Sequence, residues 1–206
     1  PVELLADAGV LSERFVAVHA THLATQEHKL LGDYRAWVCL CPTTERDLGD
    51  GLPNVTLINA DALKSKNHLN PDVMAVVEAK LSEDPERKLK LVANLPYDVA
   101  TPVISNLVAS ELPWVAMVVT IQLELAQRMA AQPKAGSNYG ALSIWLQSQC
   151  QIKLLKKLGP QVFWPRPNVD SAILSIRPDR ERRAAIADRA FFHELVRGIF
   201  TQRRKH

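Results

Sequence analysis

Residues 88–97 read Lys88-Leu89-Lys90-Leu91-Val92-Ala93-Asn94-Leu95-Pro96-Tyr97, an apolar run that ends abruptly in a carboxamide and a proline. The run over 88–93 predicts a β-strand. Pro96 has a fixed φ and no N–H, so the strand cannot continue through it. In open α/β sheets, ligands bind outside the carboxyl ends of the strands. The four residues 94–97 are therefore expected at the edge of a sheet where ligands bind.

The predicted elements on either side of this stretch alternate between strand and helix. Asn70–Leu81 predicts a helix with Pro71 in its first turn. Trp114–Ile121 is nearly all apolar, as expected of a central strand buried on both faces. Similar patterns predict helices over 101–110, 122–131, 140–149 and 191–200, and strands over 55–59, 151–157 and 171–177. The order predicts an α/β fold, a mostly parallel sheet with helices on both faces.

The segment Asn94-Leu95-Pro96-Tyr97 suits methylation of an exocyclic amine on a nucleobase. The N6 lone pair of adenine is delocalised into the ring, so it is a poor nucleophile. The Asn94 carboxamide and a backbone carbonyl near Leu95 or Pro96 can accept its two N–H bonds and localise that lone pair. Tyr97 can stack on the base, which must first leave its helical stack. The alternative is a tight turn in which Asn94 caps the following helix.

Several further segments, in the same order along the chain, resemble the small-subunit ribosomal RNA adenine-N6 dimethyltransferases. With residues 94–97, they are Asn59-Ala60-Asp61-Ala62-Leu63, Gln122-Leu123-Glu124 with Arg128, Tyr139-Gly140-Ala141-Leu142-Ser143, Phe163-Trp164-Pro165-Arg166-Pro167-Asn168-Val169-Asp170-Ser171, and Phe200 with Gln202-Arg203-Arg204-Lys205. The resemblance covers residues 52–206. It implies a Rossmann-like methyltransferase core over 52–178 and, over 179–206, the start of a truncated C-terminal helical RNA-binding domain.

This resemblance also implies a reaction and a set of site residues. The reaction is dimethylation of adenine N6 in small-subunit ribosomal RNA, with S-adenosylmethionine as methyl donor. Asn94, Leu95, Pro96, Tyr97 and Phe163 are expected at the catalytic site, with Tyr97 and Phe163 on either side of the base. Asp61 and Asn94 are expected to contact the cofactor. The residues themselves leave two alternatives open, because Asp61 could cap a helix and Phe163 could plug the sheet edge. Asn168 stands where the family pattern has a lysine, which implies one weaker phosphate contact.

Residues 1–51 do not follow that pattern. The family's cofactor loop is glycine-rich because a Cβ would block close approach of the backbone to the ligand. Here the only Gly-x-Gly is Gly49-Asp50-Gly51, which follows no suitable strand-to-helix turn, and His19 stands where an acidic ribose ligand is expected. We therefore expect weak or absent binding of S-adenosylmethionine. An inactive RNA-binding remnant is the first alternative function.

The same segment resembles amidohydrolase-barrel deaminases of the formiminoglutamate deiminase type, through residues 15–23 and 39–51. That resemblance implies a metal ligand at His19, and a fragment of a metal-dependent deaminase is the second alternative function. A catalytic zinc needs about three protein ligands. The other ligands of that family have no counterpart, and His22, Cys39 and Cys41 do not complete a common zinc spacing, so no metal is expected. The sequence thus reads as a composite with a junction near residues 51–53.

The charge distribution changes at the same point. Residues 1–51 carry 4 basic and 8 acidic side chains, a net charge of −4, whereas residues 52–206 carry 21 basic and 14 acidic side chains, a net charge of +7. The last 30 residues hold nine Arg and Lys against four acidic residues. A basic half with a basic end indicates a polyanionic partner, here ribosomal RNA. The alternative is a solvated surface helix.

Composition excludes several other classes of protein. The chain has 206 residues, of which 47% are hydrophobic and 23% charged, typical of a globular protein with a real core. No apolar run approaches the roughly 18 residues of a membrane span, and residues 1–10 have no signal-peptide pattern. Three cysteines, Cys39, Cys41 and Cys150, argue against a disulfide framework and for a reducing compartment. We expect a cytoplasmic monomer.

Overall fold

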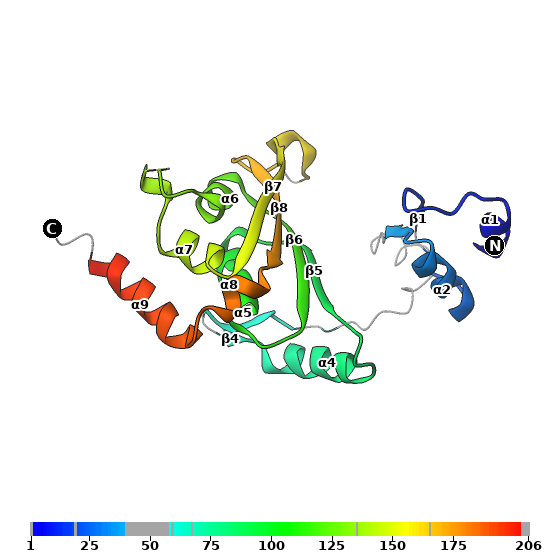
Figure 1. Cartoon of the computed structure of the whole chain (residues 1–206). Helices are drawn as coiled ribbons and strands as arrows, with labels where there is room; N and C mark the ends of the chain where they lie inside the picture. Colours follow the sequence, from blue (N-terminus) through cyan, green and yellow to red (C-terminus); the bar gives the residue numbers. More distant parts are fainter. Residues whose placement is uncertain are drawn as a thin grey trace. The chain divides into compact units, whose positions relative to one another are not determined.

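The computed structural model describes residues 2–18, 20–39, 58, 60–66, 68–134, 136–164 and 166–202. The chain divides into two compact units, an N-terminal unit of residues 1–59 and a C-terminal unit of residues 60–206 (Figure 1). Each unit is described by itself. The predicted strand at 55–59 lies almost entirely outside the described residues, and the boundaries predicted at 51/52 and 178/179 remain predictions.

The N-terminal unit is a small β-α-β arrangement preceded by a helix. It contains α1 (Val2–Asp7), β1 (Val16–Val18), α2 (Thr25–Asp33) and β2 (Trp37–Cys39), and the two strands pair in parallel. Leu11 and Leu31 are buried in its core. Glu27 is also buried, and its carboxylate accepts hydrogen bonds from the Val2 amide (2.7 Å) and the Ala24 amide (3.1 Å). This carboxylate therefore ties the start of α1 to the start of α2.

The C-terminal unit is built on a four-stranded mixed sheet in the order β5-β6-β8-β7. These strands are β5 (Leu89–Asn94), β6 (Trp114–Gln122), β7 (Cys150–Leu158) and β8 (Ser171–Pro178). β5 and β6 are parallel, but β8 is antiparallel to both β6 and β7. The expectation of a mostly parallel sheet is wrong for this sheet. Residues 159–170 contain a short 3-10 turn instead of a crossover helix, so the chain returns antiparallel.

Six helices and a small hairpin complete the described part of this unit. The hairpin pairs β3 (Leu63–Ser65) with β4 (His68–Leu69), and a 3-10 turn spans Gly136–Asn138. The helices are α4 (Pro71–Ser82), α5 (Tyr97–Ala109), α6 (Leu123–Ala130), α7 (Ala141–Gln147), α8 (Arg180–Ala184) and α9 (Arg189–Gln202). Each predicted helix is present within a few residues. No helix of the described residues is long and apolar enough to cross a membrane.

The core lies between one face of the sheet and helices α5, α6 and α7. One row of this face runs across all four strands through Ala93, Val119, Leu174 and Leu154. It packs with buried side chains of the three helices, including Ile104, Met129 and Leu146. On the opposite face Val92 is 77% exposed. Among the described residues of the C-terminal unit, the helical packing that buries the core thus lies on one face of the sheet.

Helix α5 begins at Tyr97, four residues before the predicted start at residue 101. The prediction placed Pro102 in the first turn because proline cannot complete an interior helical hydrogen bond. In the structure Pro102 lies inside the helix. Its missing N–H affects the carbonyl of Asp98, an exposed residue whose backbone can be satisfied by water. The helix therefore starts directly at the end of the Asn94-Leu95-Pro96-Tyr97 segment.

The Tyr139–Ser143 motif joins two helices. The buried Ser143 hydroxyl donates to the Arg128 carbonyl near the end of α6 (2.6 Å) and accepts from the Gly140 amide at the start of α7 (3.2 Å). The Gln147 amide group donates to the carbonyls of Met129 (2.9 Å) and Ala131 (2.7 Å). Side chains of α7 thus donate to carbonyls at the end of α6, where a helix does not supply all the partners that its last carbonyls need.

Candidate active site

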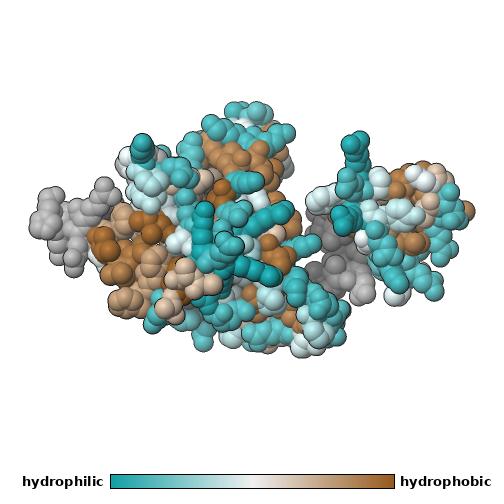
Figure 2. Space-filling view, in the orientation of Figure 1, coloured by the Kyte–Doolittle hydropathy of each residue, from teal (hydrophilic) through white to brown (hydrophobic). Residues whose placement is uncertain are grey.

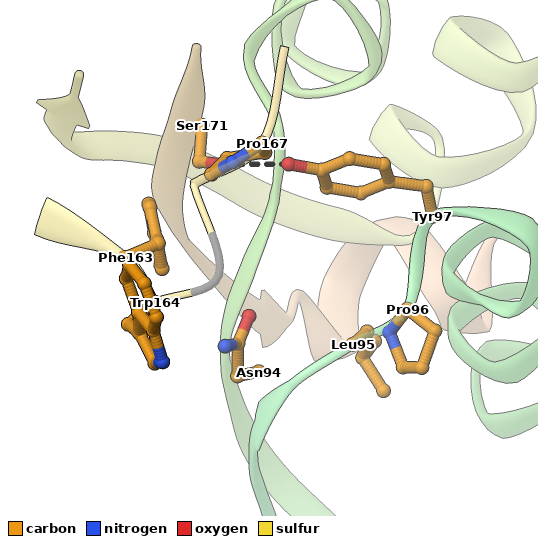
Figure 3. Close-up of a pocket in the computed structure, with 8 residues that line it drawn as sticks. All are labelled: Asn94, Leu95, Pro96, Tyr97, Phe163, Trp164, Pro167 and Ser171. Carbon is orange, nitrogen blue, oxygen red and sulfur yellow. Dashed lines mark hydrogen bonds between the residues drawn. The ribbon is translucent and has the colours of Figure 1, made fainter. Parts of the chain in front are cut away.

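A pocket of about 320 Å³ lies where β5 ends, next to the loop that leads into β8 (Figure 3). Both walls of the pocket come from segments quoted in the sequence motifs. The residues that line it are Asn94, Leu95, Pro96, Tyr97, Phe163, Trp164, Pro167 and Ser171. The structure therefore brings all five predicted catalytic residues to one place, although Phe163 is separated from Asn94 by almost 70 positions in the sequence.

The first wall is the turn from β5 into α5. Asn94 is paired in register with Thr120 of β6, and the Leu95 amide donates to the Thr120 carbonyl (3.1 Å). Pro96 is the N-cap residue of α5, whose N-terminus has no side-chain cap. The alternative in which Asn94 caps this helix is therefore not what the structure shows. The exposed Asn94 carboxamide lies at the mouth of the pocket (Figure 3).

The two backbone carbonyls proposed as amine acceptors differ in their surroundings. The Pro96 carbonyl accepts hydrogen bonds from the amides of Val99 (3.2 Å) and Ala100 (3.1 Å), in the first turn of α5. Since both bonds belong to the helix, Pro96 is poorly placed to accept from a ligand. The Leu95 carbonyl, one residue earlier, is the better candidate for an acceptor beside Asn94.

Tyr97 connects the first wall to the start of β8. Its hydroxyl lies 3.3 Å from Oγ of Ser171, and either oxygen can be the donor. Ser171 is buried, whereas Tyr97 is half-buried with its ring along the pocket (Figure 3). The hydrogen bond therefore holds the ring by its polar end and leaves ring surface beside the pocket.

The second wall is the loop between β7 and β8. Phe163 is half-buried and Trp164 is 96% exposed, and both lie across the pocket from Tyr97 (Figure 3). The end of the loop is bonded to helix α6, because the Asp170 carbonyl accepts from the Leu123 amide at the start of that helix (2.9 Å). The alternative in which Phe163 only plugs the sheet edge does not account for its position on the wall of a pocket.

Asp61 lies apart from this set. Its Oδ1 accepts from the Leu63 amide (2.9 Å), and its carbonyl accepts from the Asn70 amide group (2.8 Å). These bonds form a turn before β3, so Asp61 caps a turn and not a helix. The side chain is exposed but is not among the residues that line the pocket at Asn94. Its predicted contact with the cofactor remains a prediction.

Comparison with known families agrees with the motifs and the fold. The sequence profile of the family described as ribosomal RNA adenine dimethylase matches residues 40–206. The chain belongs to this family. The match includes the whole C-terminal unit and therefore both walls of the pocket.

Bacterial relatives of the ribosomal RNA adenine dimethylase family align with the chain at substantial identity. A ribosomal RNA small subunit methyltransferase A from Oceanobacillus iheyensis is 35% identical over 204 residues, which are 99% of this chain and 63% of the relative. The same-named protein from Bacillus licheniformis is 41% identical over 152 residues, 74% of this chain and 49% of the relative. The chain thus spans about half to two thirds of the length of these relatives.

Two solved structures share the fold. A dimethyladenosine transferase from Plasmodium falciparum has a TM-score of 0.61 with 20% identity, covering 98% of this chain and 68% of that protein. The 23S rRNA methyltransferase ErmE has a TM-score of 0.53, also with 20% identity, covering 98% of this chain and 76% of that protein. These similarities confirm the predicted α/β, Rossmann-like methyltransferase fold class.

The residues present fit the family's cofactor, S-adenosylmethionine, only in part. Asp61 and Asn94 are exposed hydrogen-bonding side chains of the C-terminal unit and could serve as its partners. The turn after β1 in the N-terminal unit differs from a glycine-rich loop. Ala20 has a φ of 53°, a left-handed conformation that glycine adopts freely and alanine does not. The Gly-x-Gly of the sequence, Gly49-Asp50-Gly51, lies outside the described residues, so the described residues hold no glycine-rich loop that fits the cofactor.

The described residues contain no group of three or more His, Cys, Asp and Glu side chains that could hold a metal ion. His19 and Cys41, two of the residues considered as ligands, lie outside the described residues, as does the side chain of Cys39.

Sequence reasoning did not single out Trp164, Pro167 or Ser171 as pocket residues. Ser171 carried no recognisable signal, because its contact with Tyr97 depends on the antiparallel placement of β8. For Trp164 a signal was present. A second aromatic residue directly after Phe163, between two prolines of a loop, is not typical of a core residue.

Proposed function

We propose that this chain is the catalytic part of a ribosomal RNA adenine-N6 dimethyltransferase. The observation that carries the proposal is the pocket in which the Asn94 carboxamide, the Leu95 backbone, Tyr97 and Phe163 converge. A flat aromatic amine needs two acceptors at its edge and apolar surface on its faces. The family match and the similarity to small-subunit methyltransferases A support adenine in small-subunit ribosomal RNA as the substrate.

Asn94 and Leu95 orient the reacting amine in this proposal. The Asn94 carboxamide oxygen accepts one N6–H bond and the Leu95 carbonyl accepts the other. The Pro96 carbonyl already accepts two hydrogen bonds within α5. The two bonds draw the lone pair out of the ring and direct it away from the two acceptors. S-adenosylmethionine, held in part by Asp61 and Asn94, supplies an activated methyl group when bound. Asn94 needs no help from a strong general base, because attack on such a methyl does not require prior deprotonation.

Tyr97 and Phe163 hold the base in the orientation that this chemistry requires. They lie on opposite walls of the pocket, on segments that are fixed by the Tyr97–Ser171 contact and by the Asp170–Leu123 hydrogen bond (Figure 3). Base–aromatic stacking contributes roughly 1–3 kcal/mol per base. An adenine that has left its helical stack can recover part of the lost stacking energy here. We expect the protein to act as a cytoplasmic monomer on the small ribosomal subunit.

A second candidate function is RNA binding without methyl transfer. The absence of a Gly-x-Gly from residues 1–48 favours it, because it disfavours binding of the cofactor. The two functions share the adenine pocket and differ in whether S-adenosylmethionine binds.

The deciding experiment measures transfer of a labelled methyl group from S-adenosylmethionine to under-methylated small ribosomal subunits, followed by nucleoside analysis. Appearance of N6,N6-dimethyladenosine, abolished by Asn94→Ala, supports the enzyme. RNA binding that competes with free adenosine but gives no methylated product supports the second candidate. Failure to bind ribosomal RNA under any salt condition contradicts both.

A further inference from the structure

Trp164 is 96% exposed on the rim of the pocket, which is unusual for the largest side chain. Trp114 and Trp145 of the same unit are buried. Two more residues of the Trp164 loop are also exposed, Val162 at 57% and Val169 at 42%. Figure 2 shows hydrophobic residues gathered at the end of the C-terminal unit where this loop lies. Of these three exposed apolar residues, Trp164 lines the adenine pocket and Val169 lines a neighbouring pocket, and we call the three together the rim.

Positive charges predominate in the sequence that leads into and through this loop, although Asp170 follows Val169 at its end and lines a neighbouring pocket with it. From Gln151 to Val169 the sequence contains no Asp or Glu, and its four charged residues are Lys153, Lys156, Lys157 and Arg166. All four side chains are exposed. A bulge in β7 between Leu154 and Lys156 changes the alternation of side chains as the strand approaches the loop. An exposed aromatic in a segment with four cationic side chains is suited to a partner that offers flat rings and phosphates.

We propose that Trp164 is a stacking platform for the unpaired nucleotide next to the target adenine. Phe163 and Trp164 are consecutive, so their Cα atoms are about 3.8 Å apart and two successive nucleotides can reach them. Lys156, Lys157 and Arg166 hold the phosphates that flank this nucleotide. The platform rests on the proposed function, since it presupposes that the neighbouring pocket takes a base. Stacking on an indole tolerates any base, so the platform recognises an unpaired strand and not a sequence.

The test uses the full chain and two labelled RNA heptamers with adenine at the centre. One heptamer is intact, and the other has abasic riboses on both sides of the adenine. Binding of each is measured by fluorescence anisotropy for the parent, Trp164→Ala and Trp164→Phe. Trp37→Ala is the matched control, because Trp37 is a 66% exposed tryptophan of the N-terminal unit. Circular dichroism melting verifies that each variant is folded.

We expect Trp164→Ala to weaken binding of the intact heptamer by about tenfold, the effect of losing one stacked base. Trp164→Phe retains most of the affinity, and Trp37→Ala leaves it unchanged. On the abasic heptamer Trp164→Ala has no effect, because the base that it would stack on is missing.

If Trp164→Ala loses the same affinity for both heptamers, or loses none for either, the proposal of a stacking platform is wrong. If the parent binds and methylates RNA while Trp164→Ala behaves like the parent, the platform fails and the proposed function stands. If the parent binds neither heptamer nor ribosomal RNA, the platform and the proposed function fail together.

Discussion

The hydroxyl of Tyr97 lies 3.3 Å from Oγ of Ser171, although the two residues are 74 positions apart in the sequence. One belongs to the first turn of α5 and the other to the first residue of β8. Because the two segments form opposite sides of the pocket, this single polar contact fixes the spacing between them. The width of the pocket therefore depends on both motifs together.

Replacing Asn94 with alanine should reduce methyl transfer far more than RNA binding. The hydrogen bonds of Asn94 to the amine strengthen as the lone pair localises, so they stabilise the transition state more than the bound base. We expect kcat to fall by about 10²–10³-fold, as for other single transition-state hydrogen-bonding groups, and RNA affinity to change by less than about threefold. Single-turnover kinetics and RNA titrations measure the two quantities.

The matched control for Asn94 is Asn106→Ala, which removes a carboxamide from the body of α5, where it donates to the Lys66 carbonyl (3.4 Å). It should leave both methyl transfer and RNA affinity near the parent values. Equal losses of activity and affinity in Asn94→Ala would point to a structural role for Asn94.

Isothermal calorimetry should show no binding of S-adenosylmethionine in the low micromolar range. The reason is that residues 1–51 contain no Gly-x-Gly other than Gly49-Asp50-Gly51, and that His19 stands where an acidic ribose ligand is expected. S-Adenosylhomocysteine, which lacks the transferable methyl, is the matched ligand and should bind as weakly. A dissociation constant of a few micromolar for either ligand would show that another backbone segment replaces the glycine loop.

Removing the Ser143 hydroxyl should destabilise the C-terminal unit. Ser143→Ala leaves the Gly140 amide without its 3.2 Å acceptor and leaves the Arg128 carbonyl with only the longer bond from the Ala131 amide (3.4 Å). Leaving buried polar groups unpaired costs about 1–3 kcal/mol. Urea denaturation should show that the free energy of unfolding falls by that amount. Ser148→Ala, at the half-buried end of the same helix, should lower the free energy of unfolding by less. Equal losses in the two variants would mean that the hydroxyl of Ser143 has no special role.

Cys150 should resist alkylation in the folded protein. Burial raises the pKa of its thiol from 9.0 to about 12, so almost no reactive thiolate forms at pH 8. With Cys39 and Cys41 replaced by serine, iodoacetamide should label Cys150 at the rate of unfolding, and urea should accelerate labelling. Since the native pKa is raised, this group favours the fold up to about pH 9 and loses that effect between pH 9 and 12. Rapid labelling without denaturant would contradict the burial.

Neutralising Arg203, Arg204 and Lys205 should weaken binding of structured RNA and flatten its salt dependence. These residues lie outside the described part of the chain, so the expectation rests on sequence alone. Phosphate contacts release counterions, and each lost contact lowers the log–log slope by about 1. The triple replacement of Arg14, Lys29 and Arg35, in the net acidic N-terminal segment, removes the same charge and should leave the slope unchanged. Identical slopes for the parent and the first triple variant would exclude the basic end as an RNA contact.

Most elements of the C-terminal unit were predictable from local patterns. The apolar runs 88–93 and Trp114–Ile121 predicted two strands, which the structure has at Leu89–Asn94 and Trp114–Gln122. Asn70 with Pro71 marks the start of α4, where Asn70 Oδ1 accepts from the Asp72 amide (2.9 Å). The direction of β8 was not predictable, because periodicity is the same for parallel and antiparallel strands. The start of α5 was misplaced because Pro102 is a strong helix-start signal that the structure tolerates in the interior.

The site was predictable to the extent that it depends on motifs. The residues Asn94 to Tyr97 and Phe163 converge as expected, because strand ends and the loops beside them share one edge of the sheet. The position of Asp61 away from the pocket, and the Ser171 partner of Tyr97, depend on how the segments pack in three dimensions. No local pattern in the sequence reports such distances.

Because β8 is antiparallel to β7, the loop that forms the pocket wall is separate from the strand pairs that hold the sheet together. Residues 159–170 form a loop between two hydrogen-bonded strands, and this loop reaches the pocket. The register of β7 with β8 is set by pairs such as Ile152 with Ile176, far from the loop. The loop can therefore change in length or composition without shifting the core. In such a scaffold, evolution can exchange one twelve-residue segment of the pocket wall while the turn at Asn94 stays as it is.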